Sequence, residues 1–360
     1  MALSDNKATG ILVAFAALVI IIAGLKAAQA LLVPFLLAFF ISIICAGPFY
    51  WLRQRRVPAA IALLLVIVVV MLGGLVVLLI IGTSVNDFTS QLPLYEQQLR
   101  TQSLVLFDWL EQFGIHLSRQ FFFDYFNPGS IMQSAGRMLA AAGGVLTNSF
   151  LILLTVIFIL FEAAGMPNKL RAALKDADTS LSSFEKFITG VRTYLVIKTL
   201  ISLCTGIIIS GGLMFIGLDY PLLWGLIAFL LNYVPNIGSI IAAVPAVLLA
   251  LVQLGPLPTL LVAILYLATN VIMGNALEPR LMGKSLGLST LVVFLSLVFW
   301  GWVLGPVGML LSVPLTMIMK IALEVNPSTL WLAILLGSDI PAKPAANDGE
   351  RRDAGAAGTP

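Results

Sequence analysis

The chain has 360 residues, of which 60% are hydrophobic and only 10% are charged, and its mean hydropathy is +1.04. Soluble proteins carry charges at about a quarter of their positions, so this composition excludes an ordinary soluble domain and indicates a protein of the lipid bilayer. The net charge of +3 is small and dispersed, which argues against nucleic acid as a partner. Two cysteines and one histidine supply neither a disulfide framework nor a metal centre, and the sequence predicts no cofactor.

The charged residues are clustered, and long charge-free stretches separate the clusters. A hydrocarbon core about 30 Å thick requires about 18 or more apolar residues of a helix that rises 1.5 Å per residue. We therefore predict an all-α polytopic membrane protein with about six full crossings. They cover residues 11–25, 31–52, 59–83, 145–161, a helix that enters the membrane near Leu195, and 258–274.

Basic residues follow the second and the fourth predicted crossing, at 53–56 and 169–198. Short loops rich in Lys and Arg stay in the cytoplasm, so we expect both termini to be cytoplasmic. The first apolar run precedes Ala28-Gln29-Ala30, which resembles a signal-peptidase site. We favour a retained helix, because Lys26 separates the run from these small residues and a second span begins at once.

Residues 84–144 mix acidic, basic and apolar residues and are predicted to lie outside the membrane. Their apolar residues recur at spacings of three, four or seven, from Leu92 and Tyr95 to Trp109 and Phe113, which places them on one face of an amphipathic helix. This face is interpreted either as a cap packed on the spans or as a contact between subunits.

These features divide the chain into five parts. We expect three N-terminal transmembrane helices (1–83), the extramembrane region (84–144), a fourth helix with a basic linker (145–198), a transport core (199–325) and a disordered tail (341–360).

The transport core contains two similar segments, each of which begins with Gly-Leu and is interrupted by a break rich in Gly and Pro. The first Gly-Leu pair is at 217–218 and the second at 287–288, and the breaks cover residues 232–239 and 301–308. Each segment then ends in Val-Pro, at 244–245 and 313–314. The matched spacing indicates two copies of one unit.

A proline between two apolar half-helices interrupts the backbone hydrogen bonds, and half-helices of ten to thirteen residues are about 15 to 20 Å long, too short to cross alone. We therefore predict two re-entrant helical hairpins, at 217–252 and 287–321, although kinked spans are the alternative. One crossing between them places them on opposite faces of the bilayer, which is the geometry of secondary transporters.

Polar and backbone groups at the tips of such hairpins must face protein or a water-filled cavity, so the tips are the predicted substrate site. Asparagine amides both donate and accept hydrogen bonds, which favours a small neutral polyhydroxy or carbonyl compound. The candidate binding residues are Asn232, Pro235, Asn236, Gly238, Ser239, Gly301, Gly305, Pro306 and Gly308.

Further polar candidates at membrane depth are Asn270, Asn275, Glu278, Arg280 and Glu162. For Glu278 and Arg280 the sequence leaves two alternatives open, namely a partner or substrate on the facing hairpin, or an interfacial ion pair that holds a helix end. Glu162 is interpreted as an interface carboxylate rather than a proton carrier. The sequence has no complete P-loop and no other catalytic motif, and it therefore predicts no enzyme.

Three stretches resemble the autoinducer-2 exporter family: residues 232–239, Leu277 to Gly283, and the run from Gly287 through Trp300-Gly301-Trp302 to Pro314. The resemblance extends over nearly the whole chain and is strongest from about residue 190 to 325. It implies an inner-membrane permease without nucleotide hydrolysis that exports a small furanone-type quorum signal. It also implies a homo-oligomer, a pentamer in members of known structure, in which the two hairpins form a moving substrate site.

The resemblance leaves the substrate open, because some members of the family are linked to sodium/proton exchange. An antiporter would use Glu278 and Glu162. A third hypothesis is a membrane scaffold for envelope proteins that binds partners through residues 84–144. We expect autoinducer-2 export by alternating access at the two hairpins.

Overall fold

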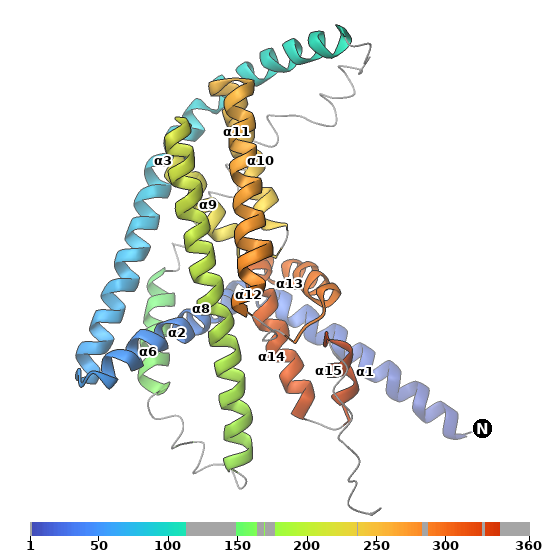
Figure 1. Cartoon of the computed structure of the whole chain (residues 1–360). Helices are drawn as coiled ribbons and strands as arrows, with labels where there is room; N and C mark the ends of the chain where they lie inside the picture. The colour runs from blue at the N-terminus through green and yellow to red at the C-terminus, as the bar shows by residue number, and fades with distance from the viewer. Residues whose placement is uncertain are drawn as a thin grey trace, which may run out of the picture.

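The computed structural model describes residues 2–112, 149–163, 169, 177–235, 237–282, 287–325 and 328–338. The described residues form helices and no strands (Figure 1). The helices are α1 (Ala2–Ala27), α2 (Gln29–Gln54), α3 (Ala59–Gln112), α6 (Ser149–Ala163), α8 (Ala177–Ile216), α9 (Pro221–Leu231), α10 (Gly238–Leu254), α11 (Pro256–Thr269), the π-helix η1 (Asn270–Leu277), α12 (Glu278–Met282), α13 (Thr290–Leu310), α14 (Ser312–Val325) and α15 (Leu330–Leu335). The predicted tail, 341–360, lies outside the described residues.

Within the described residues, five helical stretches are long and apolar enough to cross a membrane: Gln29–Gln54, Ala59–Ser84, Ile188–Ile216, Pro256–Met282 and Thr290–Leu310. Their outer surfaces carry large exposed apolar side chains, such as Phe215 at 95% exposure, as expected of helices in a lipid bilayer. The prediction of an all-α polytopic membrane protein is therefore confirmed.

Two of the six predicted crossings correspond to shorter apolar helices, Leu12–Ala27 and Ser149–Ala163. The fifth stretch, Thr290–Leu310, was instead predicted as part of the second broken hairpin. The pattern of long spans thus differs from the predicted one at three places, because the sequence gives the apolar runs but not where each helix starts and ends.

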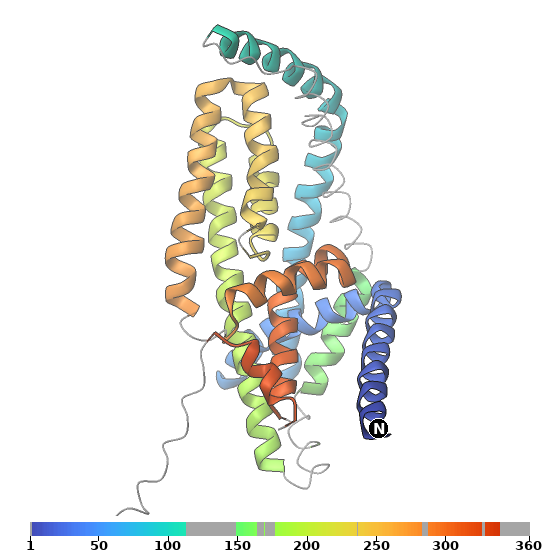
Figure 2. The ribbon, with the colours of Figure 1, turned by 90° about the vertical axis from the view of Figure 1, so that its right-hand side faces the viewer.

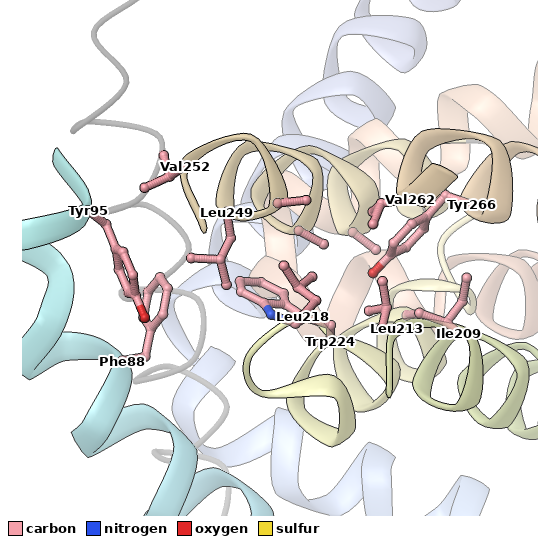
Figure 3. Packing of buried hydrophobic residues seen from close by; sticks show 14 residues of the cluster. Phe88, Tyr95, Ile209, Leu213, Leu218, Trp224, Leu249, Val252, Val262 and Tyr266 are labelled. Carbon is pink, nitrogen blue, oxygen red and sulfur yellow. The ribbon is translucent and has the colours of Figure 1, made fainter. Parts of the chain in front are cut away.

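Helix α8 connects two separate core clusters (Figure 1). The first core cluster lies around the C-terminal half of α8 and includes Ile209, Leu213 and Trp224, with Tyr266 from α11 (Figure 3). The second core cluster lies around Val191 and Leu195 of α8 and is built mainly from α2, α13 and α14. One helix therefore contacts the two predicted hairpins at different positions along its length.

Helix α3 continues through residue 84 to Gln112 without interruption. Beyond the predicted span, Phe88 and Tyr95 are buried, and Phe88 packs edge-on against Trp224 of α9. Burial raises the pKa of the Tyr95 phenol above its usual value, so the hydroxyl remains protonated and donates to Gln91 Oε1 over 2.8 Å. At this position α3 covers the protein itself, as the cap interpretation expects. The side chain of Trp109 and the whole of Phe113 lie outside the described residues.

The first predicted hairpin is an antiparallel pair of helices, α9 and α10, joined by residues 232–237. At its open end, the backbone N–H of Asp219 donates to Gln253 Oε1 over 3.0 Å. At its tip, Asn232 contacts Ser202, which lies 14 residues before the end of α8 at Ile216, or about 21 Å along the helix axis. The tip therefore lies beside the middle of α8.

The second predicted hairpin has a different shape. Helix α13 contains an interruption at Gly305, whose φ of +70° and ψ of −155° are not helical. In Figure 2, α13 lies across α8 rather than along it, and α14 leaves the middle of the molecule in the direction opposite to α10. A re-entrant position of either hairpin in a bilayer stays a prediction.

The two hairpins nevertheless share local features that support the internal repeat. Each opens with a glycine at positive φ, Gly217 and Gly287, and each of these glycine carbonyls accepts a hydrogen bond from the returning helix. A Cβ at Gly238 would overlap the carbonyl oxygen of Leu231, and one at Gly308 would overlap that of Trp300. In both copies, glycine allows the chain after the break to lie directly against a backbone carbonyl of the helix before it.

Candidate functional site at the first hairpin tip

A polar stripe runs along one face of α8, although most of this helix is apolar. Its members Tyr194, Lys198, Ser202 and Thr205 are spaced by four, four and three residues, which places them on one helix face, and all four are buried. Because the stripe lies in the candidate span Ile188–Ile216, each polar group in it needs a partner from the protein.

The tip of the first hairpin supplies a partner for one member of the stripe, Ser202, and for the neighbouring Thr199. Asn232 Nδ2 donates to Ser202 Oγ over 2.9 Å, and the hydroxyl of Tyr233 donates to Thr199 Oγ1 over 2.7 Å. Asn232 is also the C-cap of α9, so the chain leaves the helix at the residue that binds α8. These hydrogen bonds fix the broken tip against the middle of a membrane-spanning helix.

Helices α8 and α9 approach closely above this tip. A Cβ at Gly225 would overlap Ser210 Oγ, and one at Gly206 would lie 2.9 Å from the carbonyl oxygen of Gly225. Small residues at a helix contact allow such an approach of two backbones in a membrane. This contact holds α9 against the polar stripe of α8.

A small cavity of about 10 Å³ lies behind the tip, which is room for about one water molecule or one hydroxyl group. The residues that line it come from α8, α9, α10 and α11 and from the first position of η1. They are Thr205, Ile209, Ala228, Asn232, Ser239, Ala242, Tyr266, Thr269 and Asn270. Three predicted site residues, Asn232, Ser239 and Asn270, are therefore brought together in one place.

Lys198 and Glu278 form a buried ion pair at the opposite end of the polar stripe. Lys198 Nζ lies 2.6 Å from Glu278 Oε1 and 2.8 Å from Glu278 Oε2, and the two side chains are 4% and 20% exposed. These residues enclose the longest charge-poor stretch of the sequence, in which Asp219 is the only charged residue. Of the two alternatives left open for Glu278, its partner belongs to α8 and not to the facing hairpin, and the ion pair lies at a helix end, since Glu278 begins α12.

The ion pair and the cavity are connected by η1. This π-helix extends from Asn270, at the cavity, to Leu277, directly before Glu278, and none of its residues is buried. π-Helical segments are rare and frequently lie at functional sites. The Lys198–Glu278 pair fixes one end of this segment and the residues around the cavity fix the other.

The predicted residues of the second tip lie elsewhere. Gly305 faces α2, since a Cβ there would lie 2.9 Å from Gln29 Nε2, and Lys26 lies 3.8 Å from the centroid of the Trp302 ring. Gly301 packs against the side chain of Met309, Gly308 is buried, and Pro306 is exposed. None of these residues lines the cavity of the first tip.

The remaining predicted residues are dispersed. Asn275 and Arg280 are exposed, and Glu162 is an exposed partner of Lys169 at 2.5 Å on a different part of the molecule. Pro235 and Gly238 lie in the first tip beside Asn232, whereas Asn236 lies outside the described residues.

The sequence reasoning missed the contribution of α8 and α11 to the site. Lys198 was counted only among the basic residues of a linker, and Ser202, Thr205, Tyr266 and Thr269 were not singled out. The spacing of the α8 stripe was a signal for its residues. No local pattern marks Tyr266, because its role depends on the packing of α11 against α8.

Comparison with known proteins assigns the chain to a family. A sequence model described as AI-2E family transporter matches residues 15–327. The chain belongs to the AI-2E transporter family.

Relatives in this family cover nearly the full chain. The AI-2 transport protein TqsA of Escherichia coli K12 is 40% identical over 319 residues, which are 89% of this chain and 93% of that protein. A putative transport protein of Haemophilus influenzae is 43% identical over 332 residues, or 91% and 95% of the two chains. The putative transport protein YhhT of Escherichia coli K12 is 38% identical over 337 residues, or 94% and 97%. These names indicate a membrane transport protein rather than an enzyme, as the sequence predicts.

Proposed function

We propose that this AI-2E family transporter is an inner-membrane secondary permease that exports a small neutral polar compound, with autoinducer-2 as the first substrate to test. The observation that carries the proposal is the polar tip of the α9–α10 hairpin. Asn232 and Tyr233 bind α8 at the tip where the hairpin is broken, and the cavity behind them is lined by hydroxyl, amide and aliphatic side chains, none of them charged. The name of the relative TqsA supports the choice of autoinducer-2.

In this proposal, the first tip binds substrate and the second tip acts as the opposing gate. Asn232, Pro235, Asn236, Gly238 and Ser239 form the first group, together with Asn270. Gly301, Gly305, Pro306 and Gly308 form the second group. The opposite directions in which α10 and α14 leave the middle of the molecule fit two gates that open to opposite sides (Figure 2).

The broken backbone explains why such a tip suits transport. Peptide groups that are not paired within a helix can bind a polar ligand at membrane depth, where water is scarce. The hydrogen bonds of the tip to Ser202 and Thr199 are single side-chain contacts, each worth about 1 kcal/mol. A ligand can therefore replace them at small cost, which permits the tip to move.

The proposal includes cytoplasmic termini, from the distribution of Lys and Arg, and a homo-oligomer, from the family.

Antiport of cations through Glu278 and Glu162 is less well supported, because each carboxylate already has a lysine partner and the two belong to different ion pairs. Scaffold function through residues 84–144 gains no support from Phe88 and Tyr95, which pack on the protein's own hairpin.

The test uses the purified full-length protein in liposomes, with labelled autoinducer-2 and with or without an imposed proton gradient. We expect saturable autoinducer-2 flux in protein-containing vesicles and none in empty ones. Flux equal to that of empty vesicles under both conditions would exclude autoinducer-2 as the substrate. A pH-sensitive dye in the same vesicles would detect cation/proton exchange on addition of sodium.

A further inference from the structure

The cavity behind the first tip contains two buried hydroxyl groups without a hydrogen-bond partner. Among the described residues, Thr205 Oγ1 and Tyr266 OH are the buried side-chain polar atoms in this condition. Thr205 is 7% exposed and Tyr266 is 6% exposed, and both line the cavity. An unpaired buried hydroxyl costs about 1 to 3 kcal/mol, so two in one cavity require an explanation.

The two hydroxyl groups belong to different helices that line the cavity. Thr205 lies one turn along α8 from Ser202, which is bound to Asn232 of the tip. Tyr266 belongs to α11, and its hydroxyl points toward α8 near Leu213 (Figure 3). Both helices are candidate spans, so the cavity lies between membrane-spanning elements and beside the broken tip.

The hydrogen-bonding capacity of the two hydroxyl groups determines which kind of group the cavity can bind. A hydroxyl offers one hydrogen and two lone pairs, so Thr205 and Tyr266 together need a partner that both donates and accepts. A cation can contact only the lone pairs and leaves the two hydrogens unpaired. An anion meets no positively charged side chain among the lining residues. A neutral hydroxyl group can form hydrogen bonds with both Thr205 and Tyr266.

We infer that Thr205 and Tyr266 form a subsite that binds one hydroxyl group of a neutral polyhydroxy substrate when the first hairpin is closed. The cavity of about 10 Å³ takes a single oxygen-centred group. The rest of the ligand would then lie along the tip, where Asn232 and Ser239 face the same space. The two residues thus determine specificity for hydroxylated compounds, a conclusion that rests on the proposed function.

The experiment measures ligand-dependent thermal stability of the full-length protein in detergent and its transport in liposomes. Two probes are used, autoinducer-2 and meso-erythritol, which is a neutral polyol. Thr205→Val and Tyr266→Phe remove one hydroxyl each and keep the shape of the side chain. Thr155→Val and Tyr50→Phe are matched controls, since Thr155 donates to Leu151 of its own helix and Tyr50 is 43% exposed.

We expect each cavity variant to raise the dissociation constant for a hydroxylated probe about tenfold, because a hydroxyl of the ligand loses its partner, while the maximal transport rate changes little. The controls should bind as the wild type does. Without ligand, the unfolding midpoint of the cavity variants should stay the same or rise, because an unpaired polar group has been removed.

Three results would overturn the inference. The first is unchanged affinity for both probes in the cavity variants, or no binding of either probe to the wild type. The second is a lower unfolding midpoint without ligand together with unchanged affinity, which assigns the cavity to a structural water molecule. The third is a higher unfolding midpoint in sodium chloride than in choline chloride that is lost in Thr205→Val. This result would assign the cavity to a cation.

The inference and the proposed function fail separately. If autoinducer-2 is not transported but erythritol binds in a manner that depends on Thr205, the subsite stands and the substrate assignment fails. If autoinducer-2 is transported through Asn232 with unchanged affinity in both cavity variants, the proposed function stands and the subsite fails.

Discussion

The α9–α10 hairpin and the α13–α14 pair arise from similar sequence segments and have different surroundings. The tip of the first lies beside the polar stripe of α8, against Ser202 and Thr199. The interruption of the second, around Gly305, faces the junction of α1 and α2, where Lys26 and Gln29 contact it. A duplicated segment therefore supplies the broken backbone, whereas the neighbouring helices decide whether the break becomes a polar site.

The largest expected effect concerns a feature that both hairpins share, a glycine packed against a backbone carbonyl. Gly238→Ala and Gly308→Ala each place a methyl group on a backbone carbonyl, of Leu231 or Trp300. We expect each variant to lose about 3 kcal/mol of unfolding free energy, as in severe overpacking, with a lower unfolding midpoint in detergent. Gly211→Ala is the control, since nothing lies within 4 Å of its added methyl group. Tolerance of either tip variant would show that the two tips are not built alike.

The next effect concerns the Lys198–Glu278 ion pair, which lies on the side of the first hairpin. Lys198→Met leaves the Glu278 carboxylate without its partner, and we expect a loss of about 2 kcal/mol of unfolding free energy, less than for a fully buried pair because Glu278 is 20% exposed. The double variant Lys198→Met with Glu278→Gln should recover part of this loss. Lys169→Met breaks the exposed pair with Glu162 and should cost at most about 1 kcal/mol. Chemical denaturation of all four proteins measures the difference, and equal losses in the two lysine variants would contradict a special role for the buried pair.

A smaller effect separates substrate binding from packing. Asn232→Ala removes the hydrogen bond to Ser202 and a group that faces the cavity, so we expect the KM for transport to rise about tenfold. Trp300→Phe removes the hydrogen bond to Thr316 in the second pair, over 3.0 Å, and should lower stability by about 1 kcal/mol with little change in KM. Transport in liposomes decides, and the reverse pattern would move the substrate site to the second tip.

The smallest effect concerns the anchor of the second tip. Lys26→Met removes the cation–π contact with the Trp302 ring, which is worth about 1 kcal/mol. We expect a slightly lower unfolding midpoint and unchanged KM. A raised KM would show that α1 takes part in substrate binding, and the contrast between the two tips would then be weaker.

The sequence was sufficient for the features that depend on local pattern. Charge-free stretches predict a polytopic all-α protein, and matched Gly-Pro breaks predict the interruption at Gly305 and the turn after Asn232. Asn232, Ser239 and Asn270 lie around one cavity, whereas their role in binding stays a prediction. These properties follow from the spacing of residue types along the chain.

Other features depend on packing between distant segments and could not be predicted. Lys198 and Glu278 are 80 residues apart, and only the antiparallel course of α8 and the helix from α11 to α12 brings them together. The orientation of α13 across α8 is likewise set by its contacts with α2 and α14. Two similar segments gave the expectation of two similar tips, but the polar residues of α14 bond within the second pair rather than at the break around Gly305: Ser312 to Met309, Thr316 to Trp300 and Lys320 to Gly287.

The central claim is that the first tip, and not the second, binds the substrate. Hydrogen–deuterium exchange of the full-length protein with and without autoinducer-2 tests it most directly, because it reports on the backbone amides of both tips in one sample. The account predicts slower exchange on ligand addition in residues 232–238 and no change in residues 301–311. Protection confined to residues 301–311 would contradict it.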